Sequence, residues 1–437
     1  MTQHTPQIRS AQHIERRYRN SFGRAAGYLP KNRAALDAWL EQFSRDVHEK
    51  RARNAIVRRR SVDDLQQLIE RDGVIRMYVS RMIEDAHAIN ADAKHTVRDI
   101  PDLLDHLDCV VTSTPRYYPK GDPDRNFFPL SSLFCYMMMT EPGYAVFRDK
   151  QFNRALLGIL REWCTHLDSP DSRDVLNKEE HGWLSPAAKD EFKLEQFLID
   201  WDDDHGGFPS YNAFFHRELL DGERPIAGKH DPRVVVSAND GRVVRIRRNI
   251  KRSDEFWAKG QRYSLHDMLD SSDLTDSFIG GDVLQSFLSG ADYHRWHAPV
   301  TGIVRSARVV EALMFTELEG VWEPSSGTES QVYGASVNTR GLVFIEAPAP
   351  LGMVCVMPLG MTEISSVTLT VRPGDHVTKG DQLGYFSYGG SSMCLLFQKG
   401  AIEEFTVPDN PGDMESGHPI QVNSQVARAA AAPKRKA

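Results

Sequence analysis

The segment Val371–Gly384 reads VRPGDHVTKGDQLG and sets short apolar runs between turn-forming glycines and aspartates. The segment His297–Val304, HAPVTGIV, shows the same combination of short strand and glycine corner. Glycine adopts the backbone conformations that tight turns require, so short strands can follow one another closely. We therefore expect these two segments to form a compact sheet that folds over on itself.

Apolar residues at alternating positions extend this β-rich region from about residue 230 onward. The sheet that they predict is similar to those of biotinyl and lipoyl carrier domains, so a non-catalytic carrier or binding module is one alternative. Carriers display a modifiable lysine at a hairpin tip, whereas Lys379 sits within the turn sequence itself, which argues against this alternative. The strand-like runs are Arg233–Ser237, Arg242–Ile246, Gly302–Arg305, Leu342–Ile345 and Met353–Val356.

The first 200 residues show helical spacing instead. Ser61 and Asp64 are spaced as a capping box, and apolar residues follow at mostly helical intervals over residues 65–83. The segments Ser132–Met139 and Phe152–Trp163 predict two further helices. Methionines at such positions are typical of core packing.

We expect an α+β protein with two domains, because 437 residues exceed the usual size of a single domain. The helical N-terminal domain would span residues 1–205 and the β-rich domain residues 206–426. The boundary would lie in the acidic, glycine-containing segment Trp201–Gly207. Residues 427–437 lack a periodic pattern, so we expect a disordered tail there.

Composition and charge narrow the class of protein. Apolar residues make up 41% of the chain, enough for a sizeable core, and no stretch approaches the roughly 18 apolar residues of a membrane span. Residues 1–60 carry a charge of +9 and the rest −16, so the basic segment is best explained as a solvated helical surface. An acidic body argues against nucleic acid as a partner. We expect no stable membrane insertion.

Cysteine and histidine spacing gives no metal or disulfide pattern. The five cysteines are odd in number and include no CxxC pair, so a reducing compartment such as the cytoplasm is expected. His294 and His297 are three residues apart and would share a helix face, as metal ligands do. Pro299 follows closely and no further ligand cluster lies nearby in the sequence, so we expect no metal.

The segment Tyr388–Phe397, YGGSSMCLLF, allows two interpretations. Gly-Gly-Ser-Ser is a common turn sequence. Alternatively, a serine after glycine in a strained turn can attack the preceding carbonyl, because glycine has no Cβ to obstruct the approach. That attack needs a base and a group to orient the base. Asp240, at the end of a predicted strand, is a candidate acid, although before Gly241 it also suits a turn.

These motifs occur in the order seen in phosphatidylserine decarboxylases, and the chain resembles that family over residues 208–405. Further motifs resemble its branch of soluble fungal L-tryptophan decarboxylases, the psilocybin-pathway type. The first set is Tyr211–Ile226, Asp240–Gly241, Lys259–Leu265, Asp292–Gly302 and Gly389–Ser392. The second set is Gly27–Pro30, Ser172–Leu176, His181–Leu184 and Gly360–Ser365.

The resemblance implies self-processing. Ser391 would attack the Gly390 carbonyl, the peptide would become an ester, and β-elimination would cut the chain. The product would be a β chain of residues 1–390 and an α chain of 47 residues that begins with a pyruvoyl group derived from Ser391. By family correspondence His297 is the base for cutting and Asp240 orients it. His294 returns a proton to the substrate.

The same resemblance implies a Schiff base between the pyruvoyl ketone and a substrate amine, without pyridoxal phosphate. Two departures from the family pattern leave self-cleavage plausible. The usual Leu-Gly-Ser-Thr is Gly389–Ser392 here, which keeps the Gly-Ser bond. The usual Ser-Pro before the acid is Ser237–Asn239, which puts the turn geometry in doubt.

The substrate suggested by the branch is a free aromatic L-amino acid, with tryptophan first. Tyr263, Trp296 and Phe315 are the expected pocket walls, because an aromatic substrate needs apolar surroundings. Phosphatidylserine is the alternative substrate, although we find no clear membrane element in the sequence. The oligomeric state stays open, a homo-oligomer included.

Overall fold

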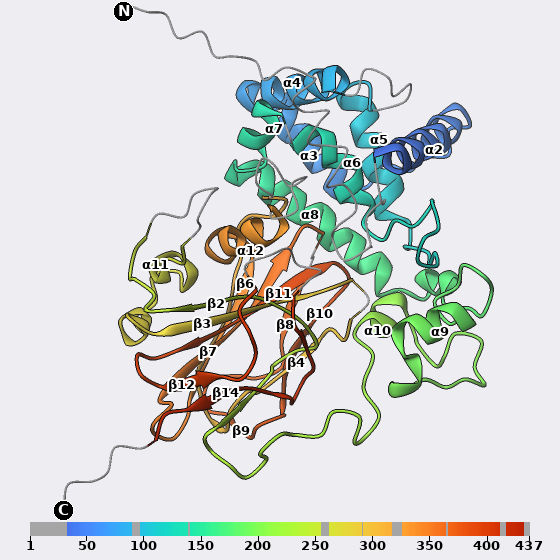
Figure 1. The fold of residues 1–437 in the computed structure, drawn as a ribbon. Coiled ribbons are helices and arrows are strands. Elements are labelled where there is room, and N and C mark those ends of the chain that lie inside the picture. The colour runs from blue at the N-terminus through green and yellow to red at the C-terminus, as the bar shows by residue number, and fades with distance from the viewer. Residues whose placement is uncertain are drawn as a thin grey trace, which may run out of the picture.

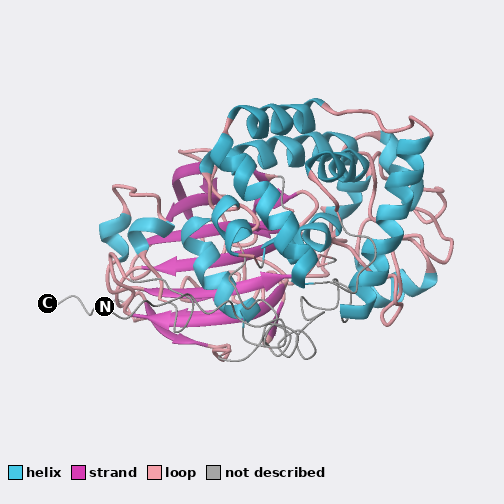
Figure 2. Cartoon of the chain, turned by 90° about the horizontal axis from the view of Figure 1, so that it is seen from above, coloured by secondary structure: helices cyan, strands magenta, loops and turns pink. Residues whose placement is uncertain are grey.

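The structure is a computed structural model of the chain. It describes residues 33–89, 97–138, 140–254, 262–290, 292–316, 326–363, 366–410 and 417–431. Helices form the first half of the chain and lie against a β-rich second half (Figure 1). Seen from above, the helices lie in front of the strands (Figure 2). The mixed helix and sheet composition confirms the expected class.

The helical half packs around one large apolar core. Leu65, Val79 and Met82 are buried there, as their helical spacing predicts. The helices are α2 (Arg33–Ala52), α3 (Arg60–Arg71), α4 (Gly73–Ile89), α5 (Ile100–Val111), α6 (Pro129–Met138), α7 (Glu141–Val146), α8 (Lys150–Leu167), α9 (Pro186–Phe192) and α10 (Tyr211–Phe215), with short 3-10 turns at Pro170–Val175 and Leu194–Gln196.

Helices α6 and α8 confirm the two predicted helical segments, but the predicted capping box does not form. Helix α3 begins at Arg60, so Ser61 lies inside its first turn. The Ser61 backbone N–H donates to the Glu162 carboxylate of α8 instead, at 2.9 Å. A tertiary partner has therefore replaced the local cap. Asp149 and Asp99 do cap their helices, since their carboxylates accept backbone N–H groups of the first turn.

The β-rich half is built on a curled antiparallel sheet of eight strands, in the order β13-β2-β3-β11-β7-β6-β5-β9. Two three-stranded sheets, β4-β10-β8 and β1-β14-β12, accompany it. The strands of the large sheet are β2 (Gly241–Arg248), β3 (Asp282–Leu288), β5 (Gly302–Val310), β6 (Arg340–Glu346), β7 (Met353–Met361), β9 (His376–Val377), β11 (Gly390–Phe397) and β13 (Pro419–Ile420).

The smaller sheets and helices complete this half. The strands are β1 (Val234–Val236), β4 (Arg295–His297), β8 (Val367–Leu369), β10 (Gln382–Phe386), β12 (Ile402–Phe405) and β14 (Gln425–Ala429). The helical segments are α11 (Leu265–Met268), a 3-10 turn at Thr275–Phe278, and α12 (Ser326–Val337).

The two glycine-rich segments lie side by side, as their shared pattern predicts. Ala298 donates its backbone N–H to the Asp381 carbonyl at 2.7 Å, and Gly380 donates to the Ala298 carbonyl at 2.9 Å. The detailed likeness to biotinyl and lipoyl domains stays a prediction. Lys379 is not displayed at a tip. Its buried ammonium donates to the carbonyls of Gly228 and Asp231, so it is unsuited to carry a group.

The C-terminal boundary requires a correction. Residues 427–429 belong to β14, which pairs with both β1 and β12, and Ala427 and Ala429 are fully buried. The small alanines fit this tightly packed strand, a role that composition alone concealed. Residues 432–437 of the predicted tail lie outside the described residues.

The described helices include none that is both long and apolar enough to cross a bilayer. The five cysteines are free thiols, and four of them are buried.

Candidate active site

Ser391 lies near the start of β11, the strand between β3 and β7. It pairs with Leu288 on one side and with Gly360 on the other. Its side chain is fully buried, and among the described residues its hydroxyl has no hydrogen-bond partner. A buried hydroxyl without a partner is costly for folding and is found where a group is kept for chemistry.

The chain enters this strand through a glycine pair. Gly389 has φ of +144°, in a region that residues with a Cβ rarely adopt, and Gly390 begins β11. The backbone before Ser391 is therefore bent and bare of side chains. No side chain at position 389 or 390 therefore stands beside the Gly390 carbonyl.

A chain of hydrogen bonds holds Ser392 on the opposite face of the strand. The Tyr263 hydroxyl donates to Gln285 at 2.6 Å, the Gln285 amide donates to the Ser392 hydroxyl at 2.9 Å, and that hydroxyl donates to the Ser286 carbonyl at 2.9 Å. The neighbouring serine thus has partners, whereas Ser391 has none within the described ranges. Tyr263 is buried and bonded to Gln285, and it is not among the residues that line the cavity described below.

His294 is a buried, neutral imidazole with one nitrogen open. Its Nδ1 lies 2.8 Å from the Asp292 carbonyl oxygen, which can only accept, so Nδ1 carries the proton and Nε2 keeps its lone pair. Nε2 has no partner among the described residues. Burial and the nearby Arg217 guanidinium lower the His294 pKa to about 3. Because the ring stacks on Phe215 at 3.9 Å, its orientation is fixed.

His297 has both ring nitrogens engaged. Nδ1 faces the Gly380 carbonyl at 2.8 Å and therefore donates, while Nε2 accepts the Tyr293 hydroxyl at 2.8 Å. Burial lowers the His297 pKa as well. The expected partner Asp240 forms neither of these bonds. Instead it pairs with Arg224 at 2.7 Å.

Asp240 nonetheless lies close enough to favour the charged form of His297 electrostatically. Asp240 also binds the backbone of a distant segment, because one of its carboxylate oxygens accepts the Val422 N–H at 2.7 Å. The predicted Asp240–His297 hydrogen bond is thus replaced by two pairs, Arg224–Asp240 and Tyr293–His297. Tyr293 lies inside the motif that we singled out, but nothing in its spacing assigned it to His297.

Aromatic side chains of the helical half enclose this centre. Tyr388, three residues before Ser391, contacts the rings of Phe128, Trp163, Tyr211 and Phe215. The hydroxyls of Tyr388 and Tyr211 are buried without a hydrogen-bond partner among the described residues. Our sequence analysis quoted segments that contain most of these residues but assigned none of them to the site, because nothing in the sequence connects the helical half to β11.

The other two expected pocket residues lie elsewhere. Trp296 is fully buried in the core beneath the sheet, where it packs on Phe386. Phe315 belongs to the helical core between Phe134 and Phe147. Both side chains pack in hydrophobic cores, and their place in a pocket wall stays a prediction.

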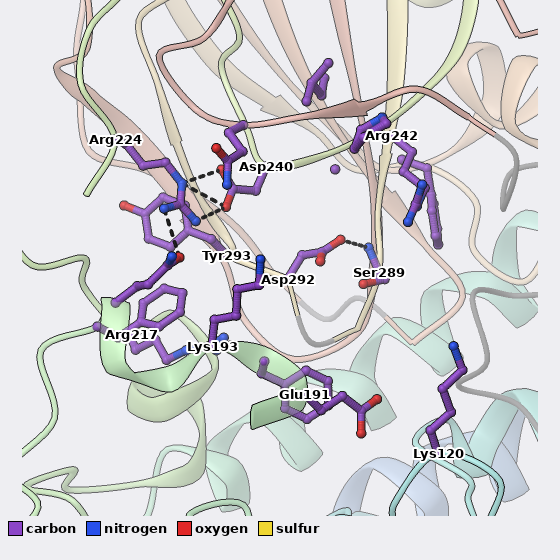
Figure 3. A pocket seen from close by; sticks show the side chains of 18 of the residues that line it. Lys120, Glu191, Lys193, Arg217, Arg224, Asp240, Arg242, Ser289, Asp292 and Tyr293 are labelled. Carbon is purple, nitrogen blue, oxygen red and sulfur yellow. Dashed lines mark hydrogen bonds and ion pairs between the residues drawn. The ribbon is translucent and has the colours of Figure 1, made fainter. Parts of the chain in front are cut away.

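A cavity of about 770 Å³ opens between the helical half and the ends of β2 and β3 (Figure 3). Its wall includes Phe287 and Ser289, which flank the Leu288 that pairs with Ser391. It also includes Asp292 and Tyr293, which bond to His294 and His297. The cavity therefore adjoins the strand that pairs with Ser391 and the partners of both histidines.

Comparison with known proteins gives the same assignment for both halves. A family model described as phosphatidylserine decarboxylase matches residues 211–427, and a second one of that description matches residues 59–192. The chain is 36% identical over 350 residues to decarboxylase iboD of Amanita muscaria, covering 74% of this chain and 99% of that protein.

Two more relatives show the breadth of the similarity. The L-tryptophan decarboxylase of Psilocybe cubensis is 27% identical over 434 residues, which cover 92% of this chain and 94% of that protein. The phosphatidylserine decarboxylase proenzyme 3 of Schizosaccharomyces pombe is 34% identical over 193 residues, or 44% of this chain and 19% of that protein. Full-length similarity thus lies with the fungal decarboxylases.

Proposed function

Since this chain belongs to the phosphatidylserine decarboxylase family, we propose that it cuts itself between Gly390 and Ser391 and then decarboxylates a free aromatic L-amino acid, tryptophan first. The observation that carries the proposal is the buried Ser391 hydroxyl, which no described residue hydrogen-bonds, next to a bare glycine backbone at the start of β11. The full-length similarity to the L-tryptophan decarboxylase of Psilocybe cubensis supports the substrate.

Ser391 fits the origin of a pyruvoyl group. Its strand is hydrogen-bonded on both sides, to β3 and β7, so residue 391 would stay in place after the chain is cut. When formed, the pyruvoyl ketone would supply the electron sink that carbon dioxide loss needs. The protein's remaining task is to move protons and to position the substrate.

We assign the proton from the Ser391 hydroxyl to His297, the residue given by family correspondence. For His297 to take that proton, the Tyr293 hydroxyl must first release Nε2. The Gly380 carbonyl keeps the ring in the correct tautomer throughout. Arg224 and Asp240 form a fixed charged pair beside it. Asp240 thus acts as a positioning residue that favours the imidazolium.

His294 is assigned to the decarboxylation. The substrate amine must lose a proton before its nitrogen can form a bond, and the open Nε2 of His294 accepts one. After carbon dioxide leaves, the α carbon needs a proton, which His294 can return. A positioned acid and base of this kind contributes about 10²- to 10⁴-fold to the rate. At neutral pH the low pKa leaves Nε2 unprotonated, so His294 gains its proton only in the complex with the substrate.

The first test is the intact mass of the denatured protein, followed by assay of its products. We expect two chains from the natural sequence, the smaller with 47 residues and no free amine, and one chain from Ser391→Ala. The natural protein should release an amine from tryptophan. Ser392→Ala is the matched control, because that serine sits beside Ser391 with its hydrogen bonds filled, and it should still be cut.

Two results would contradict the proposal. Cutting at residue 390 in Ser391→Ala would overturn the nucleophile. No amine from tryptophan, tyrosine or phenylalanine, together with phosphatidylethanolamine from phosphatidylserine vesicles, would establish the lipid as substrate.

A further inference from the structure

The cavity beside the site contains more positive charge than its carboxylates neutralise. Its lining includes six basic and three acidic side chains. Two of the acids, Glu191 and Asp240, are paired with arginines of the same wall. The third, Asp292, accepts the Ser289 backbone N–H, and burial raises its pKa. The negative charge of the cavity is therefore largely neutralised by these arginines or reduced by burial.

Two of the six basic side chains form these ion pairs, and a third, Arg217, lies over the Phe197 ring, 4.1 Å from its centroid. The other three cations are Lys120, Lys193 and Arg242. Across the described part of the chain, no ion pair involves Lys120, Lys193 or Arg242. The Arg242 guanidinium donates a hydrogen bond to the Gly417 carbonyl at 3.1 Å. They come from three separate segments: a loop after α5, the end of α9 and strand β2. In Figure 3 the Lys193 side chain rises from the helical half toward Asp292. Unpaired cations that converge on one cavity favour an anionic ligand.

Lys193 occupies a backbone position that suits glycine better. It follows α9 with φ of +49° and ψ of +51°, the left-handed region, and its N–H caps the helix on the Lys189 carbonyl. Glycine is the usual residue there, because a Cβ costs about 1 kcal/mol or more in this region. A lysine at this position therefore brings a strained backbone, and its exposed side chain lines the cavity.

Apolar rings line the same space. Phe192 and Phe197 come from the helical half, and Phe287 and Tyr293 from the β-rich half. A ligand that fits both features has an anionic group and an aromatic body. The volume of about 770 Å³ lies within the range of small-molecule sites.

We propose that this cavity receives the amino-acid substrate and that Lys193 binds its α-carboxylate, with Arg242 on the opposite wall as a second cation. The inference rests on the proposed function for the identity of the substrate. It adds a recognition site that the helical half and the sheet build together. The shared chemistry is a carboxylate beside an amine, which a free amino acid and the seryl headgroup of phosphatidylserine both have.

The chemistry predicts which kinetic constant should change. Loss of carbon dioxide removes the negative charge of the carboxylate. A cation that binds the carboxylate therefore stabilises the bound substrate more than the transition state. Lys193 should therefore lower KM without raising kcat. A residue that merely supported the fold would not give this separation.

The experiment measures binding to uncut Ser391→Ala protein, with tryptophan and with tryptophanamide, which lacks the carboxylate. We expect tryptophan to bind better, and Lys193→Gly to reduce that preference about ten-fold, the value of a charge-assisted hydrogen bond. Lys193→Arg should retain the preference. Lys189→Gln is the control, since Lys189 lies on the same helix, over Trp201, outside the cavity. It should have no effect.

Kinetics of the cut enzyme provide the second measurement. Lys193→Gly should raise KM about ten-fold, should not lower kcat and should leave self-cleavage unchanged. Glycine relieves the strained backbone, so a folding defect is not expected. An unchanged preference and an unchanged KM in folded Lys193→Gly would overturn the inference, as would a fall in kcat alone.

Glycerophosphoserine, the soluble headgroup, separates the two sources of the carboxylate. If it replaces tryptophan as the ligand that depends on Lys193, the site serves the lipid; if neither ligand depends on Lys193, the inference fails. The proposed function fails separately, through absence of amine from tryptophan in the cut natural protein, while the binding preference still decides the role of Lys193.

Discussion

At the scale of single residues, the site consists of side chains whose protonation is set by carbonyl groups. The Asp292 and Gly380 carbonyls each fix a proton on the Nδ1 of one histidine. The two histidines then differ at Nε2, which is open in His294 and occupied by Tyr293 in His297. This difference supports the different tasks that we propose for the two imidazoles.

The low pKa of His294 has a consequence for stability against pH. The pKa falls from 6.5 in the unfolded chain to about 3 in the folded one, so the unfolded state binds the proton first as pH falls. Above pH 6.5 the imidazole is neutral in both states, so this group does not reduce the free energy of unfolding. Between pH 6.5 and 3 the free energy of unfolding falls, because the unfolded state binds the proton. At pH 5 the loss should be about 2 kcal/mol. Because His294→Gln lacks this imidazole, we expect its free energy of unfolding to fall by about 2 kcal/mol less than that of the natural protein between pH 7 and pH 5.

Urea unfolding at the two pH values, in the Ser391→Ala background, measures the difference on a single uncut chain. The same substitution at the exposed His266 is the control for loss of an imidazole. An equal loss of stability in the natural and His294→Gln proteins would mean that His294 is not kept neutral by burial.

The candidate residues themselves could be predicted from the sequence, but their partners could not. Ser391 and His294 stand in motifs whose chemistry is local, a serine after glycine and a histidine beside a strand. The ion pair of Arg224 with Asp240 joins residues 16 positions apart, and the Tyr388 cluster joins β11 to helices more than 200 positions away. Such contacts depend on tertiary packing, which no short motif contains.

At the scale of elements, the position of β4 determines where His297 and its neighbours lie. Strand β10 packs against β4, and Gly384 faces Trp296 in the register. A Cβ at Gly384 would lie 2.2 Å from the Thr368 carbonyl oxygen and 2.4 Å from the Trp296 ring. There is no room for a methyl group, so this glycine allows β4 and β8 to approach β10 from both sides.

We predict that Gly384→Ala destabilises the protein by about 1–3 kcal/mol, the usual cost of overpacking, and slows self-cleavage by displacing β4. Thermal unfolding and the time course of cutting measure both effects. Gly73→Ala is the control, because a Cβ there meets only the flexible end of Arg76, at 3.7 Å. If Gly384→Ala unfolds and cuts like the natural protein, β4 does not position the site.

The apolar run Met393–Phe397 was visible in the sequence, but its place in the sheet was not. Met393 and Leu395 point into one core, while Cys394 and Leu396 point into the other. An apolar run of this kind suits a central strand as well as a buried helix segment. Pairing with β3 and β7 determined the outcome, and it placed Ser391 at the protected centre of the sheet instead of in an exposed turn.

At the scale of the whole molecule, one hydrophobic core crosses the expected boundary near residues 201–207. The cluster that holds the helices also contains Tyr293, Met314, Phe315 and Tyr388 of the β-rich half. Two hydrogen bonds also join the halves. The Glu363 carboxylate accepts the Ser131 backbone N–H at 2.9 Å, and the Asn153 side-chain oxygen accepts the Met314 backbone N–H at 2.8 Å. The division into domains therefore remains a proposal about sequence organisation, and the active centre draws on both halves.

This shared core predicts that residues 206–437 alone will not cut themselves. Without the helices, Tyr388 loses the Phe128 and Trp163 rings that hold it three residues before Ser391. We expect the shortened chain to stay uncut by intact mass, and co-expression of residues 1–205 to restore cutting. Because a shortened chain can fail to fold for other reasons, Trp163→Leu in the full chain is the second variant and should slow cutting while the protein remains folded. Cutting at the natural rate in both variants would mean that the helices only cover a centre that the sheet builds by itself.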